Sequence, residues 1–279
     1  MTDLQQRIGD AVASIRKRTK IVPEAAIVLG TGLGGLVANV KDRVTIPYKS
    51  IPHFPVSTVQ SHSGNLILGT LSGRSVVVMQ GRFHRYEGYS FQDVVFPIRV
   101  MGSKGGLGAR TLLLTNAAGG LNPQFHAGDI MIITDHINLM ANSPLVGRNA
   151  DFLGDRFPDM SEPYTKRLRD QAEEIARKLK IPVRQGVLVG NLGPTLETGA
   201  EYRFLRTIGG DATGMSTIPE TIAAVHMGMD VFGMSIITNE CFPDSLAPAT
   251  HEHNVEVASR GEAKMTNIIK ELVKKLGKK

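Results

Sequence analysis

The chain has 279 residues, of which 42% are hydrophobic and 21% are charged, and its formal net charge is +6 at pH 7. This composition is ordinary for a soluble globular protein, and the length suits one large α/β domain or two small ones. Because no apolar stretch approaches the length of a membrane span, the sequence predicts no membrane partner.

Much of the positive charge lies in two places, residues 16–18 and the lysine-rich C-terminal end. No aromatic side chains are interleaved with these charges, so we predict solvated helix ends and no nucleic-acid partner. The one cysteine, Cys241, cannot form an internal disulfide, which fits a reducing compartment. The polar N-terminal residues lack the apolar core of a signal peptide, and we therefore expect a cytoplasmic protein.

The first half of the chain alternates short apolar runs with helical patterns. Apolar residues at helical spacing predict helices over 3–18 and 91–103, the second with a kink at Pro97. Apolar runs predict buried strands at 25–29, 66–68, 76–79, 111–114 and 130–133. Residues 45–63, rich in proline, serine and threonine, are expected to form an ordered loop or sheet edge.

The second half continues this alternation after an irregular segment over 141–162. We predict a helix over 164–179, a strand over 181–189, a helix over 198–207, a short strand and loop over 211–216, a helix over 219–228, a strand over 231–237 and a long C-terminal helix. The whole pattern predicts one α/β domain over residues 1–279, with a central, largely parallel or mixed β-sheet flanked by helices.

Polar or glycine-rich clusters follow several of the predicted strands. They lie at Thr31, Arg82, Ala117, Ser216 and Asn239. Ligands of α/β proteins bind at the carboxyl ends of strands, so this recurrence favours a binding site at that edge of the sheet. In the cluster after 76–79, Arg82 and His84 are two positions apart, so their side chains point the same way in an extended chain. A guanidinium beside an imidazole suits an anion.

The glycine-rich segment 30–35 matches the dinucleotide-binding pattern G-x-G-x-x-G. However, no acidic residue stands between Arg43 and Ser61, where that motif needs one to bind ribose. The segment could instead cradle a single phosphate with backbone N–H groups and the Thr31 hydroxyl, or serve only as a tight turn. The segment by itself leaves these readings open.

Taken together, these segments resemble the purine nucleoside phosphorylases of the homotrimeric type, through nearly the whole chain. The resemblance rests on ordered motifs: Gly30 to Gly35; Gly81-Arg82-Phe83-His84 with Tyr86-Glu87-Gly88-Tyr89; Asn116-Ala117-Ala118-Gly119-Gly120-Leu121-Asn122; Gly128-Asp129-Ile130; Asp135-His136-Ile137-Asn138-Leu139; Gly154-Asp155-Arg156-Phe157-Pro158; Gly214-Met215-Ser216-Thr217 with Pro219-Glu220; and Ile237-Thr238-Asn239. Each motif is weak alone, and their order makes the signal strong. The resemblance implies the nucleoside phosphorylase fold and phosphorolysis of purine nucleosides in purine salvage.

The resemblance also implies roles for individual residues. The implied phosphate site consists of Thr31, Arg82, His84, the backbone at Ala117 and Ser216, with His62 close by. Tyr86 and Met215 would line the ribose, and His251 would meet its 5′-hydroxyl. Glu197 and Asn239 would bind the purine, and the nucleoside pocket would also include Ala118, Gly119, Leu196 and Thr238. The implied catalytic residues are His84, Glu197, Asn239 and His251.

The implied chemistry sets the base preference and the assembly. Glu197 as a carboxylate accepts from the N1–H of a 6-oxopurine, which favours guanosine, inosine and their 2′-deoxy forms over adenosine. Phe157 matches the aromatic residue that closes the site of the adjacent subunit, so a homotrimer is expected. The chain departs from the family pattern at Thr31 (commonly serine), at Leu196 (aromatic in some relatives) and in the stretch Gly190-Asn191-Leu192. His253, two residues from His251, is an alternative at the 5′-hydroxyl.

Several alternatives remain at this stage. A methylthioadenosine phosphorylase would want an acidic residue at Asn239, whereas a xanthosine-preferring phosphorylase needs only small changes around Glu197. A dinucleotide-binding oxidoreductase is disfavoured because the chain lacks the acidic residue of that motif, and nothing in the sequence supports a non-catalytic nucleoside binder. His251 and His253 cannot share one helix face. We therefore expect no metal and no organic cofactor, with inorganic phosphate as a co-substrate.

Overall fold

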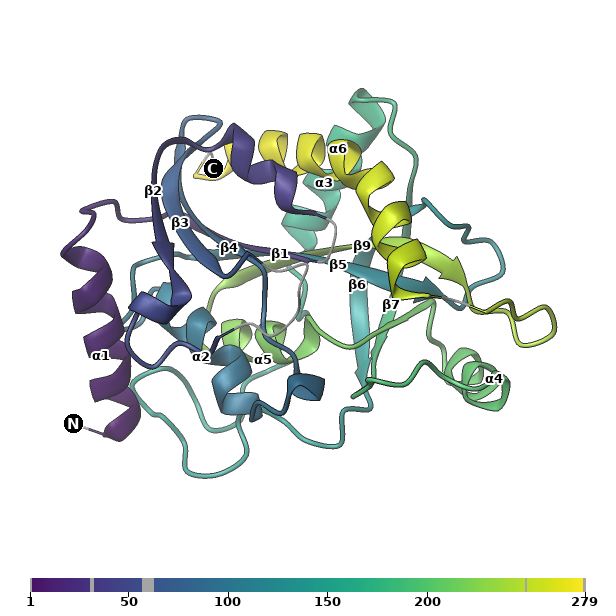
Figure 1. Ribbon diagram of the computed structural model, residues 1–279, viewed down its shortest axis with the longest axis horizontal. Coiled ribbons are helices and arrows are strands. Elements are labelled where there is room, and N and C mark those ends of the chain that lie inside the picture. The colour runs from purple at the N-terminus through teal and green to yellow at the C-terminus, as the bar shows by residue number, and fades with distance from the viewer. Residues whose placement is uncertain (1, 31–32, 57–62, 249, 278–279) are drawn as a thin grey trace.

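The computed structural model describes residues 2–30, 33–56, 63–248 and 250–277 (Figure 1). Its α-helices are α1 (Asp3–Arg16), α2 (Phe91–Met101), α3 (Lys166–Lys178), α4 (Gly199–Thr207), α5 (Ile218–His226) and α6 (His251–Lys275). Its strands are β1 (Ala25–Leu29), β2 (Lys41–Pro47), β3 (Asn65–Leu71), β4 (Arg74–Gln80), β5 (Thr111–Gly120), β6 (Ile130–Asn138), β7 (Val183–Gly190), β8 (Ala212–Gly214) and β9 (Asp230–Glu240). Short 3₁₀ turns cover Gly34–Asn39, Tyr48–Ser50 and Arg85–Glu87.

All of these strands belong to one mixed sheet, in the order β2-β3-β4-β1-β5-β8-β7-β6-β9. Strand β9 also pairs with β5, so the strands from β5 to β9 close into a ring. The strands β4, β1, β5 and β9 are mutually parallel, because β1 pairs in parallel with β4 and β5, and β5 with β9. Their carboxyl ends therefore lie at one edge of the sheet, which is where a ligand site is expected.

Helices cover both faces of the sheet (Figure 1). Helices α3 and α6 pack on one face, and α2 and α5 pack on the other, with α1 against α2. All five residues of β1 are buried, and successive residues such as Ile27 and Val28 pack into the cores on opposite faces of the sheet. Burial on both sides explains the continuous apolar runs in the sequence, and the predicted α/β fold class is confirmed.

The two central strands are longer than the sequence predicted. Strands β5 and β9 were expected to end at residues 114 and 237, but their pairing continues through Ala117 with Ile236 and ends at Gly120 with Glu240. A Cβ on Gly119 would lie 2.5 Å from the Cys241 Sγ, so a glycine is needed for this close packing. The small residues that suggested a loop therefore belong to paired strands.

Helices α1 to α5 begin and end within two residues of the expected positions, and the end of α2 and the start of α6 have local causes. Helix α2 ends at Met101 because Gly102 is extended, so it stops two residues before the predicted end. Helix α6 begins at His251, where Thr250 caps it by accepting a hydrogen bond from the His253 N–H. The His251-Glu252-His253 stretch is thus the first turn of the last helix.

Candidate functional site

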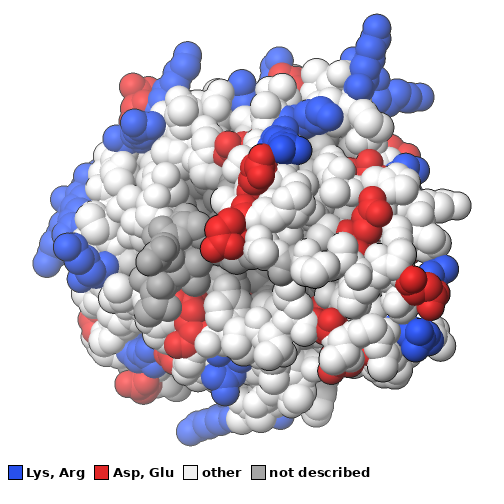
Figure 2. All heavy atoms as spheres, turned by 45° about the vertical axis from the view of Figure 1, so that its right-hand side comes forward, with Lys and Arg blue, Asp and Glu red and all other residues white. Residues whose placement is uncertain are grey.

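A pocket opens where the carboxyl ends of the parallel strands meet β8 and the loop before α4. Twelve of the residues predicted from the sequence line it: Arg82, His84, Tyr86, Ala117, Ala118, Gly119, Leu196, Glu197, Met215, Ser216, Thr238 and Asn239. Figure 2 shows a hollow in the face turned toward the viewer, and most of the Lys and Arg side chains visible in this view lie around the edge of that face. The fold thus brings into one site residues that are far apart in the sequence.

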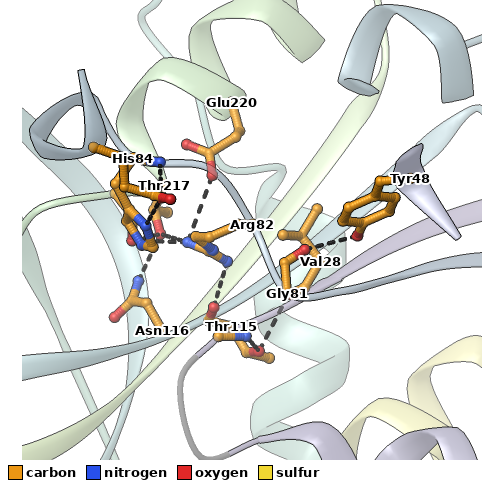
Figure 3. A network of polar contacts seen from close by, with 12 residues as sticks. Val28, Tyr48, Gly81, Arg82, His84, Thr115, Asn116, Thr217 and Glu220 are labelled. Atoms are coloured by element: carbon orange, nitrogen blue, oxygen red, sulfur yellow. Dashed lines mark hydrogen bonds and ion pairs between the residues drawn. The ribbon is translucent and has the colours of Figure 1, made fainter. Parts of the chain in front are cut away.

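Arg82 enters the site immediately after β4, where the chain turns at Gly81 with a φ of 102°. The Tyr48 hydroxyl donates to the Gly81 carbonyl at 2.8 Å and so holds the turn (Figure 3). A φ in this range favours glycine, which explains the residue that precedes the arginine.

The Arg82 guanidinium is 2% exposed and is held from several sides (Figure 3). Its Nη1 donates to Ser216 Oγ at 2.8 Å and Thr217 Oγ1 at 3.0 Å, and its Nη2 donates to the Thr115 carbonyl at 2.5 Å. Glu220 Oε1 lies 3.6 Å from Nη1 and is itself 2% exposed. Burial lowers the pKa of Arg82, while the charge of Glu220 acts to raise it. The result is a pre-oriented cation beside the Ser216 hydroxyl.

Thr217 joins this arrangement through a strained backbone. Its φ is 76°, and the Ile218 N–H donates to the Ser216 carbonyl at 2.9 Å, so the three residues form a γ-turn of the rare positive-φ form. The Thr217 hydroxyl, fully buried, also accepts from Asn116 Nδ2 at 2.8 Å. Strain of this kind is characteristic of functional sites. Neither Thr217 nor Glu220 was given a role from the sequence.

His84 lies beside the guanidinium and is oriented by Glu87. Glu87 Oε1 lies 2.9 Å from His84 Nδ1 and accepts from the His84 backbone N–H at 2.8 Å. The Tyr86 ring stacks on the imidazole at 4.6 Å between centroids, and burial raises the pKa of Tyr86 to about 12. Burial lowers the pKa of His84, and its hydrogen bond to Glu87 partly opposes this effect. An anion bound beside Nε2 would favour the protonated ring.

Three histidines, His84, His136 and His226, have a pKa lowered chiefly by burial. Because the folded protein binds fewer protons than the unfolded chain below the ordinary pKa of about 6.5, stability is lost as the pH falls below that value. We expect a lower melting temperature at pH 5.5 than at pH 7.5, measured by calorimetry. His226→Gln should reduce that difference, and an undiminished difference would assign it to other groups.

The opposite end of the pocket is built around Glu197 and Asn239. Asn239 Oδ1 accepts from the Thr238 hydroxyl at 3.0 Å, and its Nδ2 donates to Cys241 Sγ at 3.2 Å. Burial raises the pKa of the Cys241 thiol to about 11, so it remains protonated at neutral pH. Glu197 Oε1 accepts from Asn191 Nδ2 at 2.8 Å and from Thr213 Oγ1 at 3.1 Å.

Further lining residues had no role predicted from the sequence. They are Gly30, Asn116, Tyr202, Thr213, Gly214, Cys241 and Asn254. Gly30 directly follows β1, and a Cβ there would lie 2.7 Å from the Thr115 carbonyl oxygen, so the close approach of the two chain segments demands glycine. Asn191, which donates a hydrogen bond to Glu197, is a polar residue that follows the predicted strand over 181–189. The other polar clusters also follow predicted strands, and this signal could have identified Asn191.

Four predicted residues do not appear in the pocket wall. Thr31 and His62 lie outside the described residues, as does the side chain of His251, whose backbone opens α6. Phe157 is 87% exposed, with the Arg156 guanidinium 5.4 Å from its ring centroid, and it is not among the lining residues of this pocket.

No helix among the described residues is long and apolar enough to cross a membrane. The same part of the chain contains no group of three His, Cys, Asp or Glu side chains that could hold a metal ion.

Comparison with known proteins agrees with this geometry. The model of the phosphorylase superfamily matches residues 24–274. Purine nucleoside phosphorylase 1 of Geobacillus stearothermophilus is 48% identical over 271 residues, which are 97% of this chain and 98% of that protein. The chain belongs to the purine nucleoside phosphorylase family. It is accordingly an enzyme of nucleoside metabolism, and the alternative of a dinucleotide-binding oxidoreductase is wrong.

Solved structures of the family share the whole fold. The Schistosoma mansoni purine nucleoside phosphorylase in complex with inosine has a TM-score of 0.92 and 44% identity, covering 98% of each chain. The Schistosoma mansoni enzyme in complex with adenosine has a TM-score of 0.92 and 45% identity, with the same coverage. The predicted nucleoside phosphorylase fold is therefore confirmed.

Proposed function

We propose that the enzyme catalyses phosphorolysis of 6-oxopurine nucleosides, namely inosine, guanosine and their 2′-deoxy forms. The products are the free purine and (deoxy)ribose 1-phosphate, and the role is purine salvage in the cytoplasm. One observation carries the proposal: a single pocket has a buried guanidinium beside a serine hydroxyl at one end, and a carboxylate beside an amide at the other. These groups suit an anion and a purine edge, respectively.

At the first end, phosphate is proposed to bind Arg82, His84, Ser216 and the backbone at Ala117, with Thr31 and His62 completing the site. As the bond between N9 and C1′ breaks, the sugar becomes cation-like, and an oriented phosphate both stabilises this charge and attacks C1′. The bond that breaks leaves its electron pair on the purine, and the new bond joins a phosphate oxygen to C1′. No covalent enzyme nucleophile, metal or organic cofactor is needed.

At the second end, Asn239 is proposed to donate to N7 of the leaving purine and Glu197 to accept from N1–H. Guanine and hypoxanthine carry N1–H, whereas adenine does not, so adenosine would offer no donor to the carboxylate oxygen of Glu197 that faces the base. The Schistosoma mansoni enzyme has been solved with both inosine and adenosine. Binding alone therefore does not define the preference, and turnover must be compared.

The sugar is proposed to lie between these ends. Tyr86 and Met215 would line the ribose, and His251 would meet the 5′-hydroxyl at the start of α6. Ala118, Gly119, Leu196 and Thr238 would form the walls of the nucleoside pocket. All of the residues named in this paragraph except His251 line one pocket, which supports this arrangement.

The test is cleavage of inosine, guanosine, xanthosine, adenosine and methylthioadenosine, with and without phosphate. We expect phosphate-dependent cleavage led by inosine and guanosine. Turnover led by xanthosine, adenosine or methylthioadenosine would keep the phosphorylase reaction and refute the proposed base preference. No cleavage of any of the five would refute the proposed activity.

We further propose that the enzyme is a homotrimer in which Phe157 reaches the neighbouring site. The 87% exposure of this aromatic ring in the isolated chain supports a partner for it. Phe157→Ala should raise KM for inosine about 10-fold, as expected for the loss of a packed aromatic, with an unchanged melting temperature. Steady-state kinetics and calorimetry measure both quantities, and Val22→Ala, at an exposed apolar residue elsewhere on the chain, is the control. An unchanged KM would refute the shared site.

A further inference from the structure

Glu197 is one corner of a closed triangle of hydrogen bonds. Asn191 Nδ2 lies 2.8 Å from Glu197 Oε1 and 2.8 Å from Thr213 Oγ1, and Thr213 Oγ1 lies 3.1 Å from the same Glu197 oxygen. Asn191 directly follows β7, Glu197 lies in the loop before α4, and Thr213 lies on β8. Tertiary structure alone brings them together.

The chemistry of the groups determines the direction of every bond in the triangle. An amide nitrogen has two hydrogens and only donates, so Asn191 donates one to each partner. The Thr213 hydroxyl accepts from Asn191 and therefore directs its own hydrogen to Glu197. Glu197 Oε1 receives both donors, which is the arrangement of an acceptor-only carboxylate.

Asn191 is itself held by the sheet. Its backbone N–H donates to the Gly214 carbonyl at 2.9 Å, directly after the register pair of Gly190 with Gly214 that ends β7 and β8. Thr213, the second donor, is 4% exposed and lies on the same short strand. Groups anchored on rigid strands orient a functional side chain better than groups on loops.

We propose that Asn191 is a positioning residue for base recognition, which together with Thr213 holds Oε1 of Glu197 and thereby orients the carboxylate for the N1–H of a 6-oxopurine. The inference rests on the function proposed above and assigns a role to the stretch Gly190-Asn191-Leu192, in which the sequence departs from the family pattern. Asn191 acts through Glu197 and does not contact the reacting atoms.

The first test replaces Asn191 by leucine, which has a similar size and no donor. We expect KM for inosine to rise about 10- to 100-fold, the effect of losing a hydrogen bond to a charged group, with KM for phosphate changed less than about twofold. Turnover of adenosine, which lacks N1–H, should change much less than that of inosine. Thr213→Val, which leaves the bond from Asn191 to Glu197, should have the same direction and a smaller effect.

Asn122→Leu is the matched control. Asn122 Nδ2 donates to the Asp211 carboxylate at 2.8 Å, so this variant also removes an amide donor from a carboxylate, outside the pocket lining. We expect it to leave the ratio of inosine to adenosine turnover unchanged. A similar change of the ratio in Asn122→Leu and Asn191→Leu would overturn the assignment, because it would indicate a general loss of structure.

A second variant tests the direction of the bonds and does not depend on the folding of Asn191→Leu. Asn191→Asp places two carboxyl groups within hydrogen-bond distance, and such a pair shares one proton at low pH. We expect kcat/KM of this variant for inosine to fall with rising pH relative to the wild type, since the shared proton is lost and the carboxylates repel. A purely structural role would leave the pH profile parallel to that of the wild type, which would overturn the proposal.

The wild-type panel separates the two hypotheses. Suppose that the wild type cleaves inosine with phosphate, and that the Asn191 variants keep the wild-type KM and the wild-type ratio of inosine to adenosine turnover. This result would overturn the role of Asn191 and leave the proposed substrate in place. Wild-type enzyme that does not cleave 6-oxopurine nucleosides would overturn the proposed substrate, and the role of Asn191 with it.

Discussion

Arg82→Met is expected to lower phosphate-dependent inosine cleavage by about 10²- to 10³-fold and to destabilise the fold by about 3–5 kcal/mol. Both effects have one cause. Arg82 and Glu220 are each 2% exposed and 3.6 Å apart, so the substitution removes the cation proposed to bind phosphate and leaves a buried carboxylate unpaired. Initial rates against phosphate concentration and denaturant unfolding measure the two effects separately.

The double variant Arg82→Met with Glu220→Gln is the control that separates charge pairing from phosphate binding. Removing both charges should restore much of the lost stability, because replacement of a buried ion pair by neutral groups is often nearly neutral. It should not restore phosphate use. The role proposed for Arg82 would be contradicted if the double variant recovered the wild-type dependence of the rate on phosphate. It would also be contradicted if Arg82→Met kept that dependence.

Asn239→Asp is expected to lower kcat/KM for inosine roughly 100-fold and to raise the turnover of adenosine relative to inosine. An aspartate cannot donate to N7 of the leaving purine, and beside a 6-oxo group its carboxylate would face another acceptor. A 6-amino group would instead donate to it. The measurement is the ratio of kcat/KM for the two nucleosides at fixed phosphate.

The partners of Asn239 provide a control for this change. Its Nδ2 donates to Cys241 Sγ at 3.2 Å, so loss of that bond could by itself move the side chain. Cys241→Ala removes the sulfur and retains the amide, and it should leave the preference for inosine over adenosine in place. The assignment of Asn239 to the base fails if Asn239→Asp keeps the wild-type ratio.

Local pattern by itself determined the elements and the class of the fold. Strand β1 is read correctly from five successive apolar residues because it is buried on both faces, and α1 is read from the helical spacing of Ile8, Ala11 and Ile15. Both signals depend only on residues near one another in the chain. The motifs around Arg82, Ser216 and Asn239 were recognisable for the same reason, and most of the predicted residues line the pocket.

Tertiary structure decided which of these groups meet and what holds them. Arg82 and Ser216 are 134 residues apart, and they meet because β4 and β5 flank β1 in parallel while β8, which precedes Ser216, pairs with the carboxyl end of β5. Glu220 is an ordinary acid in the first turn of α5 until burial makes it the counter-charge of Arg82. The role proposed for Asn191 likewise depends on the pairing of β7 with β8. Hydrogen bonds and ion pairs between distant segments leave no periodic signal in the sequence, and therefore only the folded chain reveals them.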